Sequence, residues 1–136
     1  MAVEVSSLRL LLVDDTLINL KVLSRMLGRL DVGTICTVDS GAKALATMEE
    51  QVFDLVITDL QMPNMSGTEL SEAIRERKFC NNSQPIVVGL TAEENESVDA
   101  LCIASGMERV LHKPITQQGL SEFLECFVTT YFPLRV

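Results

Sequence analysis

The sequence predicts a doubly wound α/β domain, in which five parallel strands carry helices on both faces. Short, apolar and β-branched runs of strand length alternate with longer stretches whose apolar residues recur at helical spacing. This alternation gives parallel strands joined by right-handed helical crossovers. The composition agrees, because the residue set AVILMFWYC makes up 47% of the chain, aromatic residues are only 4%, and there is no Trp. Such an aliphatic core suits helices packed on a sheet of Val, Ile and Leu.

The strands are predicted where apolar runs stop at polar or turn-forming residues. The third run is the clearest, because it ends at Asp59 and a proline, Pro63, prevents it from continuing. The five expected strands are residues 10–13, 34–38, 55–59, 86–91 and 109–111.

The helices are predicted from apolar residues at helical spacing and from end signals. Thr16 is a candidate N-cap for the first helix, and Gly106 is a C-cap signal for the fourth. The five expected helices are residues 17–30, 41–51, 68–78, 95–105 and 116–131. In the second helix we expect these residues to face inward: Ala42, Leu45, Ala46 and Met48. In the last helix the expected core stripe is Leu120, Phe123, Leu124, Phe127, Val128 and Tyr131.

Length, charge and cysteine content narrow the class of protein. A chain of 136 residues is the size of one domain, and we expect residues 1–136 to form it, with a core from about residue 8 to residue 131. The net charge of −8 argues against binding to nucleic acid or an anionic membrane. The first apolar run is too short for a signal peptide or membrane span, so no membrane insertion and a cytoplasmic location are expected. Four widely spaced cysteines without a CxxC pair indicate reduced thiols more than a zinc site.

Polar side chains are predicted at the ends of four strands. Asp14 and Asp15 follow the first strand, Asp59 ends the third, Thr91 ends the fourth and Lys113 follows the fifth. In doubly wound sheets the ligand lies outside the carboxyl ends of the strands, where the strand order reverses. The sequence therefore predicts one site built from these residues.

The residue types at this edge suit metal-assisted phosphoryl chemistry. Two carboxylates ~5 Å apart repel each other by about 3 kcal/mol at an effective dielectric constant of ~20. A divalent cation relieves this repulsion, and oxygen ligands favour Mg²⁺, with Mn²⁺ as the alternative. Asp59 is the best nucleophile candidate because it stands alone, while Asp14 and Asp15 suit a metal. Lys113 would supply positive charge and Thr91 a hydroxyl donor to a phosphoryl oxygen.

At this point the whole chain resembles a two-component receiver domain, the phosphoacceptor module of response regulators and hybrid histidine kinases. The matching residues, in order, are Asp14-Asp15, Asp59, Met62-Pro63, Gly67, Thr91-Ala92 and Lys113-Pro114. The resemblance implies a flavodoxin-like sheet in the order 2-1-3-4-5 with five helices.

The resemblance also implies a role for each residue of the site. Asp59 would accept a phosphoryl group from a phosphohistidine on a histidine kinase or histidine phosphotransfer protein. Asp15, Asp59 and the main-chain carbonyl of Gln61 would bind Mg²⁺ directly, and Asp14 mostly through water. Lys113 would pair with the phosphate, Thr91 would move toward it as a switch, and the Lys113-Pro114 bond would be cis. Such a domain catalyses its own phosphorylation and dephosphorylation and is not by itself a turnover enzyme.

Two features narrow the resemblance. Many receivers carry Tyr or Phe three residues before the lysine as the second half of the switch, whereas this chain has Val110. Signalling would then depend more on backbone shifts. The segment 84–92, QPIVVGLTA, together with Ile18-Asn19, is similar to receivers of hybrid kinases and favours a phosphorelay member.

Several residues near the expected site have two interpretations. His112 is the only histidine, and as the neighbour of Lys113 in a strand it should point away from the site. Gln61 and Glu93 either tune the lifetime of the phosphoryl group or are solvated loop residues. Leu17, Ile18 and Met65 either dock a helical donor or cap the core, with docking favoured for Ile18.

Three functions compete at this stage. The first is the phosphorylation-switched module, either part of a hybrid kinase or a stand-alone response regulator, with a phosphorylation-dependent dimer left open. The second is an aspartate-nucleophile phosphohydrolase of the haloacid dehalogenase type. Those enzymes need an Asp-x-Asp motif after the first strand, where this chain has adjacent aspartates. The third is a receiver-shaped docking domain without phosphotransfer.

Overall fold

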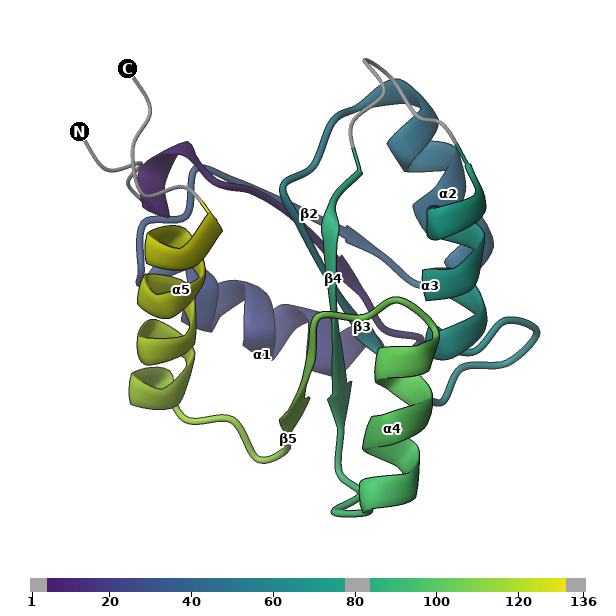
Figure 1. The fold of residues 1–136 in the computed structure, drawn as a ribbon. Helices are drawn as coiled ribbons and strands as arrows, with labels where there is room; N and C mark the ends of the chain where they lie inside the picture. The colour runs from purple at the N-terminus through teal and green to yellow at the C-terminus, as the bar shows by residue number, and fades with distance from the viewer. Residues whose placement is uncertain (1–4, 78–83, 132–136) are drawn as a thin grey trace.

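The computed structural model describes residues 5–77 and 84–131, which form a parallel sheet flanked by helices (Figure 1). The sheet has five strands in the order β2-β1-β3-β4-β5, which confirms the predicted fold class and strand order. The strands are β1 (Arg9–Val13), β2 (Thr34–Val38), β3 (Leu55–Asp59), β4 (Ile86–Thr91) and β5 (Arg109–His112). The α-helices are α1 (Leu17–Gly28), α2 (Gly41–Glu50), α3 (Gly67–Glu76), α4 (Glu96–Ala104) and α5 (Gln117–Tyr131), and a short 3₁₀ helix, η1 (Val5–Ser7), precedes β1.

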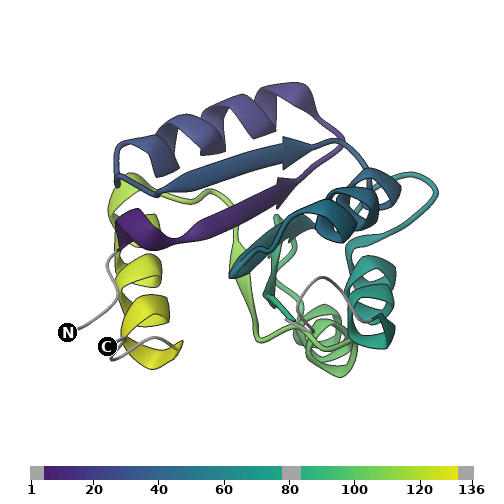
Figure 2. The same ribbon diagram turned by 90° about the horizontal axis from the view of Figure 1, so that it is seen from above.

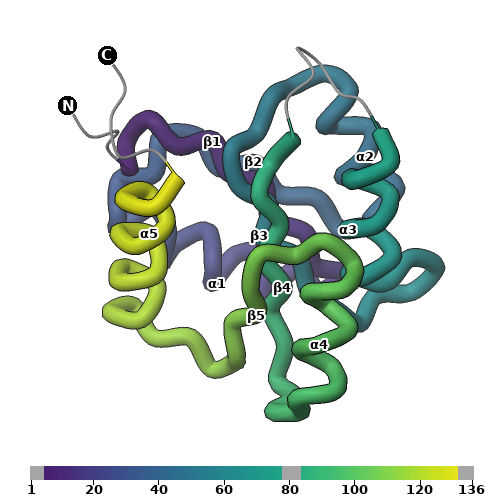
Figure 3. Tube along the Cα trace, viewed as in Figure 1, coloured from purple at the N-terminus to yellow at the C-terminus, as the bar shows by residue number. Residues whose placement is uncertain are grey.

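The order of the strands reverses between β1 and β3. The chain passes from β1 outward to β2, then returns to the other side of β1 as β3 and continues to β4 and β5 (Figure 3). The crossovers from β1 and β3 therefore leave in opposite directions. This reversal marks the carboxyl ends of β1 and β3 as the place where a doubly wound sheet holds its ligand.

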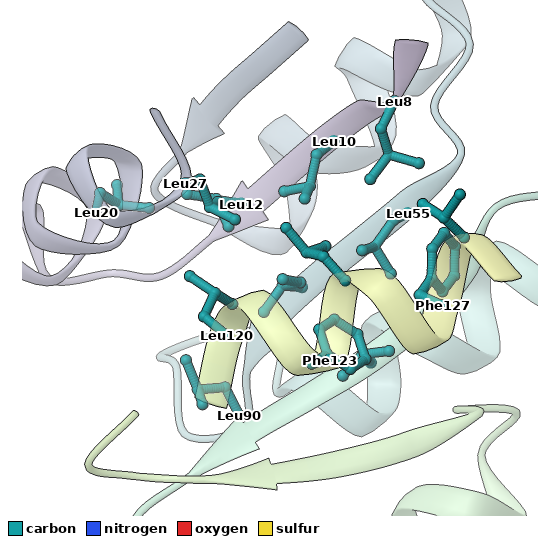
Figure 4. Close-up of a cluster of buried hydrophobic side chains, with 14 residues drawn as sticks. Leu8, Leu10, Leu12, Leu20, Leu27, Leu55, Leu90, Leu120, Phe123 and Phe127 are labelled. Carbon is teal, nitrogen blue, oxygen red and sulfur yellow. The ribbon is translucent and has the colours of Figure 1, made fainter. Parts of the chain in front are cut away.

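Two hydrophobic clusters lie on the two faces of the sheet. Side chains alternate between the faces of a strand, so Leu10 and Leu12 join the cluster under α1 and α5, while Leu11 and Val13 join the other under α2, α3 and α4. In Figure 2, which views the molecule from above, α1 and α5 lie apart from α2, α3 and α4. Figure 4 shows how Leu120, Phe123 and Phe127 of α5 lie over the strand leucines.

Short polar signals fix the starts of three helices. The Ser40 side chain accepts a hydrogen bond from the Lys43 amide at the start of α2, and the Asn95 side chain does the same for the Ser97 amide in α4. Helix α3 begins with a capping box between Ser66 and Glu69. Thr16 occupies the N-cap position of α1 as predicted, but its side chain makes no capping hydrogen bond.

The expected inward face of α2 needs a correction. Ala42 and Ala46 are exposed, and the buried residues of the helix include Ala44 beside Leu45 and Met48. Alanine is small enough to appear on either face, so the larger Leu and Met set the buried stripe. In α5, by contrast, the predicted stripe is buried from Leu120 to Val128, and its last member, Tyr131, is half-buried.

Within the described residues, every helix is too short or too polar to cross a lipid bilayer. Cys36, Cys102 and Cys126 carry free thiols. Cys80 and most of the predicted loop before β4 lie outside the described residues.

Candidate phosphoacceptor and metal site

The carboxyl ends of β1, β3 and β5 bring three predicted side chains to the same face of the sheet. Every second side chain of β3 points to the same face of the sheet, so Asp59 follows Leu55 and Ile57. Both of these apolar residues belong to the cluster under α1 and α5. Asp14 follows Leu10 and Leu12 by the same step of two, and Lys113 follows Leu111. The apolar pattern that fills the core therefore also aims these polar residues at one point.

Asp14, Asp15 and Asp59 form an acidic cluster that could bind a metal ion. One carboxylate oxygen from each residue lies within 4.8 Å of the others. Asp14 is buried, Asp59 is half-buried and Asp15 is exposed, so the cluster is open to solvent on one side. This all-oxygen donor set fits a hard divalent cation that keeps part of its water shell.

Lys113 lies between two of the carboxylates without bonding tightly to either. Its Nζ atom is 3.8 Å from Asp59 Oδ1 and 4.0 Å from Asp14 Oδ2. The Lys113 main-chain amide donates a 2.8 Å hydrogen bond to the Thr91 carbonyl, which anchors the residue to the end of β4. The following Lys113-Pro114 bond is cis, as the resemblance implied.

The two oxygens of Asp59 have different surroundings. Oδ1 accepts a 3.0 Å hydrogen bond from the Leu60 amide and faces Lys113, whereas Oδ2 has no hydrogen-bond donor among the described residues. Burial raises the pKa of the Asp59 carboxyl, the Asp14 charge raises it further, and Lys113 and the Leu60 amide oppose these effects. Asp59 therefore keeps an available oxygen in a site that disfavours its negative charge.

Three other residues of β4 and β5 point to the opposite face of the sheet from Asp59: Thr91, Val110 and His112. The Thr91 hydroxyl accepts a 3.1 Å hydrogen bond from the Glu93 amide and makes none with the acidic cluster. Val110 is partly buried in the cluster under α2, α3 and α4, away from the three aspartates. The His112 ring points to α4, where Nε2 lies 3.2 Å from Asp99 Oδ1, as the sequence led us to expect.

Gln61 and Glu93 connect two loops at the rim of the site. The Gln61 side-chain amide donates a 2.6 Å hydrogen bond to Glu93 Oε1, and both residues are exposed. This contact joins the segment after β3 to the segment after β4. Met65, which the sequence left open, is half-buried and packs on the core cluster under α2 and α3.

Gly67 allows α3 to begin directly against the end of β3. Its amide donates a 2.9 Å hydrogen bond to the Leu60 carbonyl. A Cβ atom there would overlap the carbonyl oxygen of Asp59 and lie 2.9 Å from Leu60 Cα. Glycine thus lets the chain turn closely behind the Asp59 carboxylate.

Sequence reasoning missed the contact between Asn19 and Asp14. From the sequence, Asn19 was noted only for its similarity to receivers of hybrid kinases. In the structure its Nδ2 donates a 3.2 Å hydrogen bond to Asp14 Oδ2. The signal was available, because a side chain in the first turn of a helix leans back over the residues that precede it.

A groove of about 310 Å³ was also not predicted from the sequence, and it runs from Asp14, Asn19 and Lys113 along α1.

The fold and the site thus define a doubly wound α/β protein with an acidic, metal-compatible site at its strand-order reversal. A model of the response regulator receiver domain matches residues 10–125, and the chain belongs to this family. It is a receiver domain of the two-component phosphorelay class, of the kind found in hybrid histidine kinases.

Known proteins give the same classification. The chain is 37% identical over 116 residues to hybrid signal transduction histidine kinase E of Dictyostelium discoideum, covering 84% of this chain and 7% of that protein. It is also similar to the receiver domain of sensor histidine kinase PA1611 from Pseudomonas aeruginosa PAO1, solved with magnesium in the active site cleft. That match has a TM-score of 0.76 and 27% identity, and covers 90% of this chain and 98% of the other. The Saccharomyces cerevisiae co-crystal of the phosphotransfer protein Ypd1 with the receiver domain of Ssk1 matches with a TM-score of 0.78 and 25% identity, over 93% of this chain and 90% of that one.

Proposed function

We propose that Asp59 accepts a phosphoryl group from a phosphohistidine on a partner protein, in a reaction that needs Mg²⁺ or Mn²⁺. The observation that carries this proposal is the convergence of Asp14, Asp15 and Asp59 beside Lys113 at the reversal point of the sheet. A carboxylate with one oxygen free of donors, next to a cation and a metal-compatible cluster, has what nucleophilic attack on phosphorus requires.

The transfer balances without any further reactant. An Asp59 oxygen forms a new O–P bond while the P–N bond to the donor imidazole breaks, and the nitrogen keeps the electron pair. A bound Mg²⁺ would supply positive charge between the carboxylates and the incoming phosphoryl oxygens. Asp15, Asp59 and the Gln61 carbonyl would hold the ion directly, and Asp14 through water.

Lys113 and Thr91 would act on the phosphorylated state. Lys113 already faces Asp59 at 3.8 Å, so its ammonium group can pair with a phosphoryl oxygen after a small movement. The Thr91 hydroxyl would leave the Glu93 amide and donate to another phosphoryl oxygen. Because Val110 replaces the aromatic residue of many receivers, the response would pass through the β4–α4 backbone more than through a side-chain rotation.

The exposed face of α1 is the best candidate for docking the phosphodonor. Leu17 and Ile18 are 66% and 67% exposed at the end of the helix nearest the site. The helix carries Lys21 and Arg25 but no acidic residue, in a chain with a net charge of −8. An apolar patch with a basic rim suits an acidic helical surface, such as that of a histidine kinase or phosphotransfer protein.

The wider setting of the domain is also part of the proposal. We expect residues 1–136 to act as a single receiver domain in the cytoplasm, with a core from about residue 8 to residue 131. A phosphorylation-dependent dimer stays a prediction, and sedimentation of the beryllofluoride form would test it.

Incubation with Mg²⁺ and acetyl phosphate, followed by mass spectrometry, tests the phosphoacceptor role. We expect one phosphoryl adduct per chain, absent in Asp59→Asn and when EDTA replaces Mg²⁺. Continuous phosphate release over many turnovers would instead indicate a hydrolase of the haloacid dehalogenase type, and no reaction would indicate a docking domain. Lys113→Ala should keep the fold but separate phosphorylation from any conformational change.

A matched pair of variants tests the docking surface. Ile18→Glu should slow transfer from a phosphorylated histidine phosphotransfer protein by about fivefold or more, equivalent to ~1 kcal/mol. Acetyl phosphate should still label this variant normally, because that small donor does not need the surface. Leu101→Glu is the control, since Leu101 is a similarly exposed apolar residue, 60% accessible, on α4. Equal slowing in both variants would argue against docking on α1.

A further inference from the structure

Asp14 is the most constrained member of the acidic cluster. It is only 6% exposed, and both of its oxygens accept hydrogen bonds from the start of α1. Oδ1 accepts from the Thr16 amide at 2.9 Å, and Oδ2 accepts from Asn19 Nδ2 at 3.2 Å. Asp15 is exposed, and within the part of the chain that the structure describes the Leu60 amide is the only hydrogen-bond donor to Asp59. The orientation of Asp14 therefore depends on two contacts, of which one is a side chain.

Asn19 is not explained by the needs of α1. Asparagine is a weak helix former, and the third position of a helix is better filled by an acidic residue that interacts with the helix dipole. Here an acidic residue would place a fourth carboxylate beside three others. An amide of the same size instead offers an N–H donor to Asp14 without adding charge.

The same contact limits where Lys113 can settle. Asp14 Oδ2 accepts from Asn19, while Lys113 Nζ stays 4.0 Å from this oxygen and 3.8 Å from Asp59 Oδ1. Without the Asn19 amide, Oδ2 would lack its only hydrogen-bond donor among the described residues. Lys113 would then be drawn toward Asp14 and would compete there with a metal ion.

We propose that Asn19 is a positioning residue of the metal site, which holds the Asp14 carboxylate toward Asp15 and Asp59 and keeps Lys113 available to Asp59. This inference rests on the proposed function, because it concerns the same Mg²⁺ site. It makes Asn19 a determinant of metal affinity even though the residue is not itself a ligand.

Mn²⁺ binding followed by electron paramagnetic resonance tests the inference, with Mn²⁺ as the probe for every variant. Asn19→Ala is expected to weaken Mn²⁺ binding about tenfold, a typical effect of removing a residue that orients a metal ligand. Ser24→Ala, a neutral change in the same helix, should leave binding unchanged. Asn19→Leu keeps a similar size and improves helix propensity, so it should bind Mn²⁺ as weakly as the alanine variant while circular dichroism shows a folded chain.

A double-mutant cycle with Asp14→Ala decides whether Asn19 acts through Asp14. Asn19→Ala should cause no further weakening in the Asp14→Ala background. Equal weakening in both backgrounds, or wild-type affinity in Asn19→Leu, would overturn the positioning role while leaving the metal site in place. Failure of the wild-type chain itself to bind Mn²⁺ would overturn the metal site and this inference with it.

Discussion

The two edges of the sheet use their polar residues in opposite ways. At the amino edge, arginines are bonded to main-chain groups that precede the strands. Arg9 Nε donates a 2.7 Å hydrogen bond to the Val52 carbonyl before β3. Arg75 donates to the carbonyls of Pro85, at 3.1 Å, and Gly106, at 2.8 Å, which precede β4 and β5. These contacts satisfy loop carbonyls and tie the strand entries together.

At the carboxyl edge the charged groups face one another instead. Three carboxylates lie within 4.8 Å, and the nearby Lys113 ammonium is 3.8 Å or more from Asp14 and Asp59. The fold holds these like charges close together, and a bound cation can relieve their repulsion. The comparison indicates that stability is concentrated at one edge and reactivity at the other, and it can be tested by substitutions at each edge.

The largest effect is expected for Gly67→Ala, which should damage both stability and the site. The new Cβ would overlap the Asp59 carbonyl, so we expect a loss of about 1–3 kcal/mol in the free energy of unfolding. Displacement of Asp59 should also weaken Mn²⁺ binding. Urea unfolding and metal titration measure the two effects.

Gly28→Ala is the matched control for this prediction. Nothing lies within 4 Å of a Cβ atom at Gly28, the last residue of α1. Its stability should stay the same or rise slightly, with unchanged metal affinity. A Gly67→Ala variant as stable as Gly28→Ala would contradict the close approach of α3 to β3.

Arg75→Ala should lower stability and leave the site intact. The substitution removes the donors to the Pro85 and Gly106 carbonyls, and because the guanidinium is exposed we expect a loss of about 1–2 kcal/mol. Arg77→Ala is the control, because among the described residues the Arg77 side chain makes only a 3.4 Å surface ion pair with Glu49, worth about 0–1 kcal/mol. If Mn²⁺ affinity falls with stability in Arg75→Ala, the two edges are not independent.

The fold and the acidic cluster were predictable because both follow from local repeats. Alternation along the strands separates Leu10 and Leu12 from Leu11 and Val13, and the same step of two carries Asp14 to the site. Strand order was available only through the family resemblance, since no local pattern distinguishes β2-β1-β3 from other orders.

The contacts that the sequence did not predict are hydrogen bonds between side chains on different loops or helix starts. The Gln61 contact with Glu93 and the Asn19 contact with Asp14 join residues whose distance depends on loop and helix-start geometry. The prediction that Ala42 and Ala46 face inward was wrong for a simpler reason, because small residues carry little information about burial. The sequence therefore identified the charged residues of the site better than the neutral ones that orient them.

The smallest expected effect, and the one most specific to the carboxyl edge, is a gain in stability for Asp59→Asn without metal. Burial and the Asp14 charge raise the pKa of Asp59 in the folded state, so the folded chain holds this proton more tightly than the unfolded chain. The proton on Asp59 therefore contributes to the free energy of unfolding at pH values below the pKa of the unfolded state. This contribution is lost as pH rises through the raised pKa of the folded state. In EDTA, Asp59→Asn should therefore be more stable than the wild type at neutral pH. The advantage should shrink as pH falls from about 7 toward about 4, which urea midpoints at each pH would measure.

Asp39→Asn provides a control of opposite sign. The exposed Asp39 pairs with Lys43 at 2.9 Å, and the hydrogen bond and charge of Lys43 lower the pKa of its carboxyl. Its contribution is present above the unfolded pKa and is lost as pH falls, so the asparagine variant should be slightly less stable at neutral pH and equal to the wild type in acid. Added Mg²⁺ should stabilise the wild type and Asp39→Asn but remove the advantage of Asp59→Asn, because only a chain with all three carboxylates gains fully from the ion. An Asp59→Asn variant that is less stable than the wild type in EDTA at neutral pH would mean that the carboxyl edge is stabilised by its charges as the amino edge is, and the contrast between the two edges would fail.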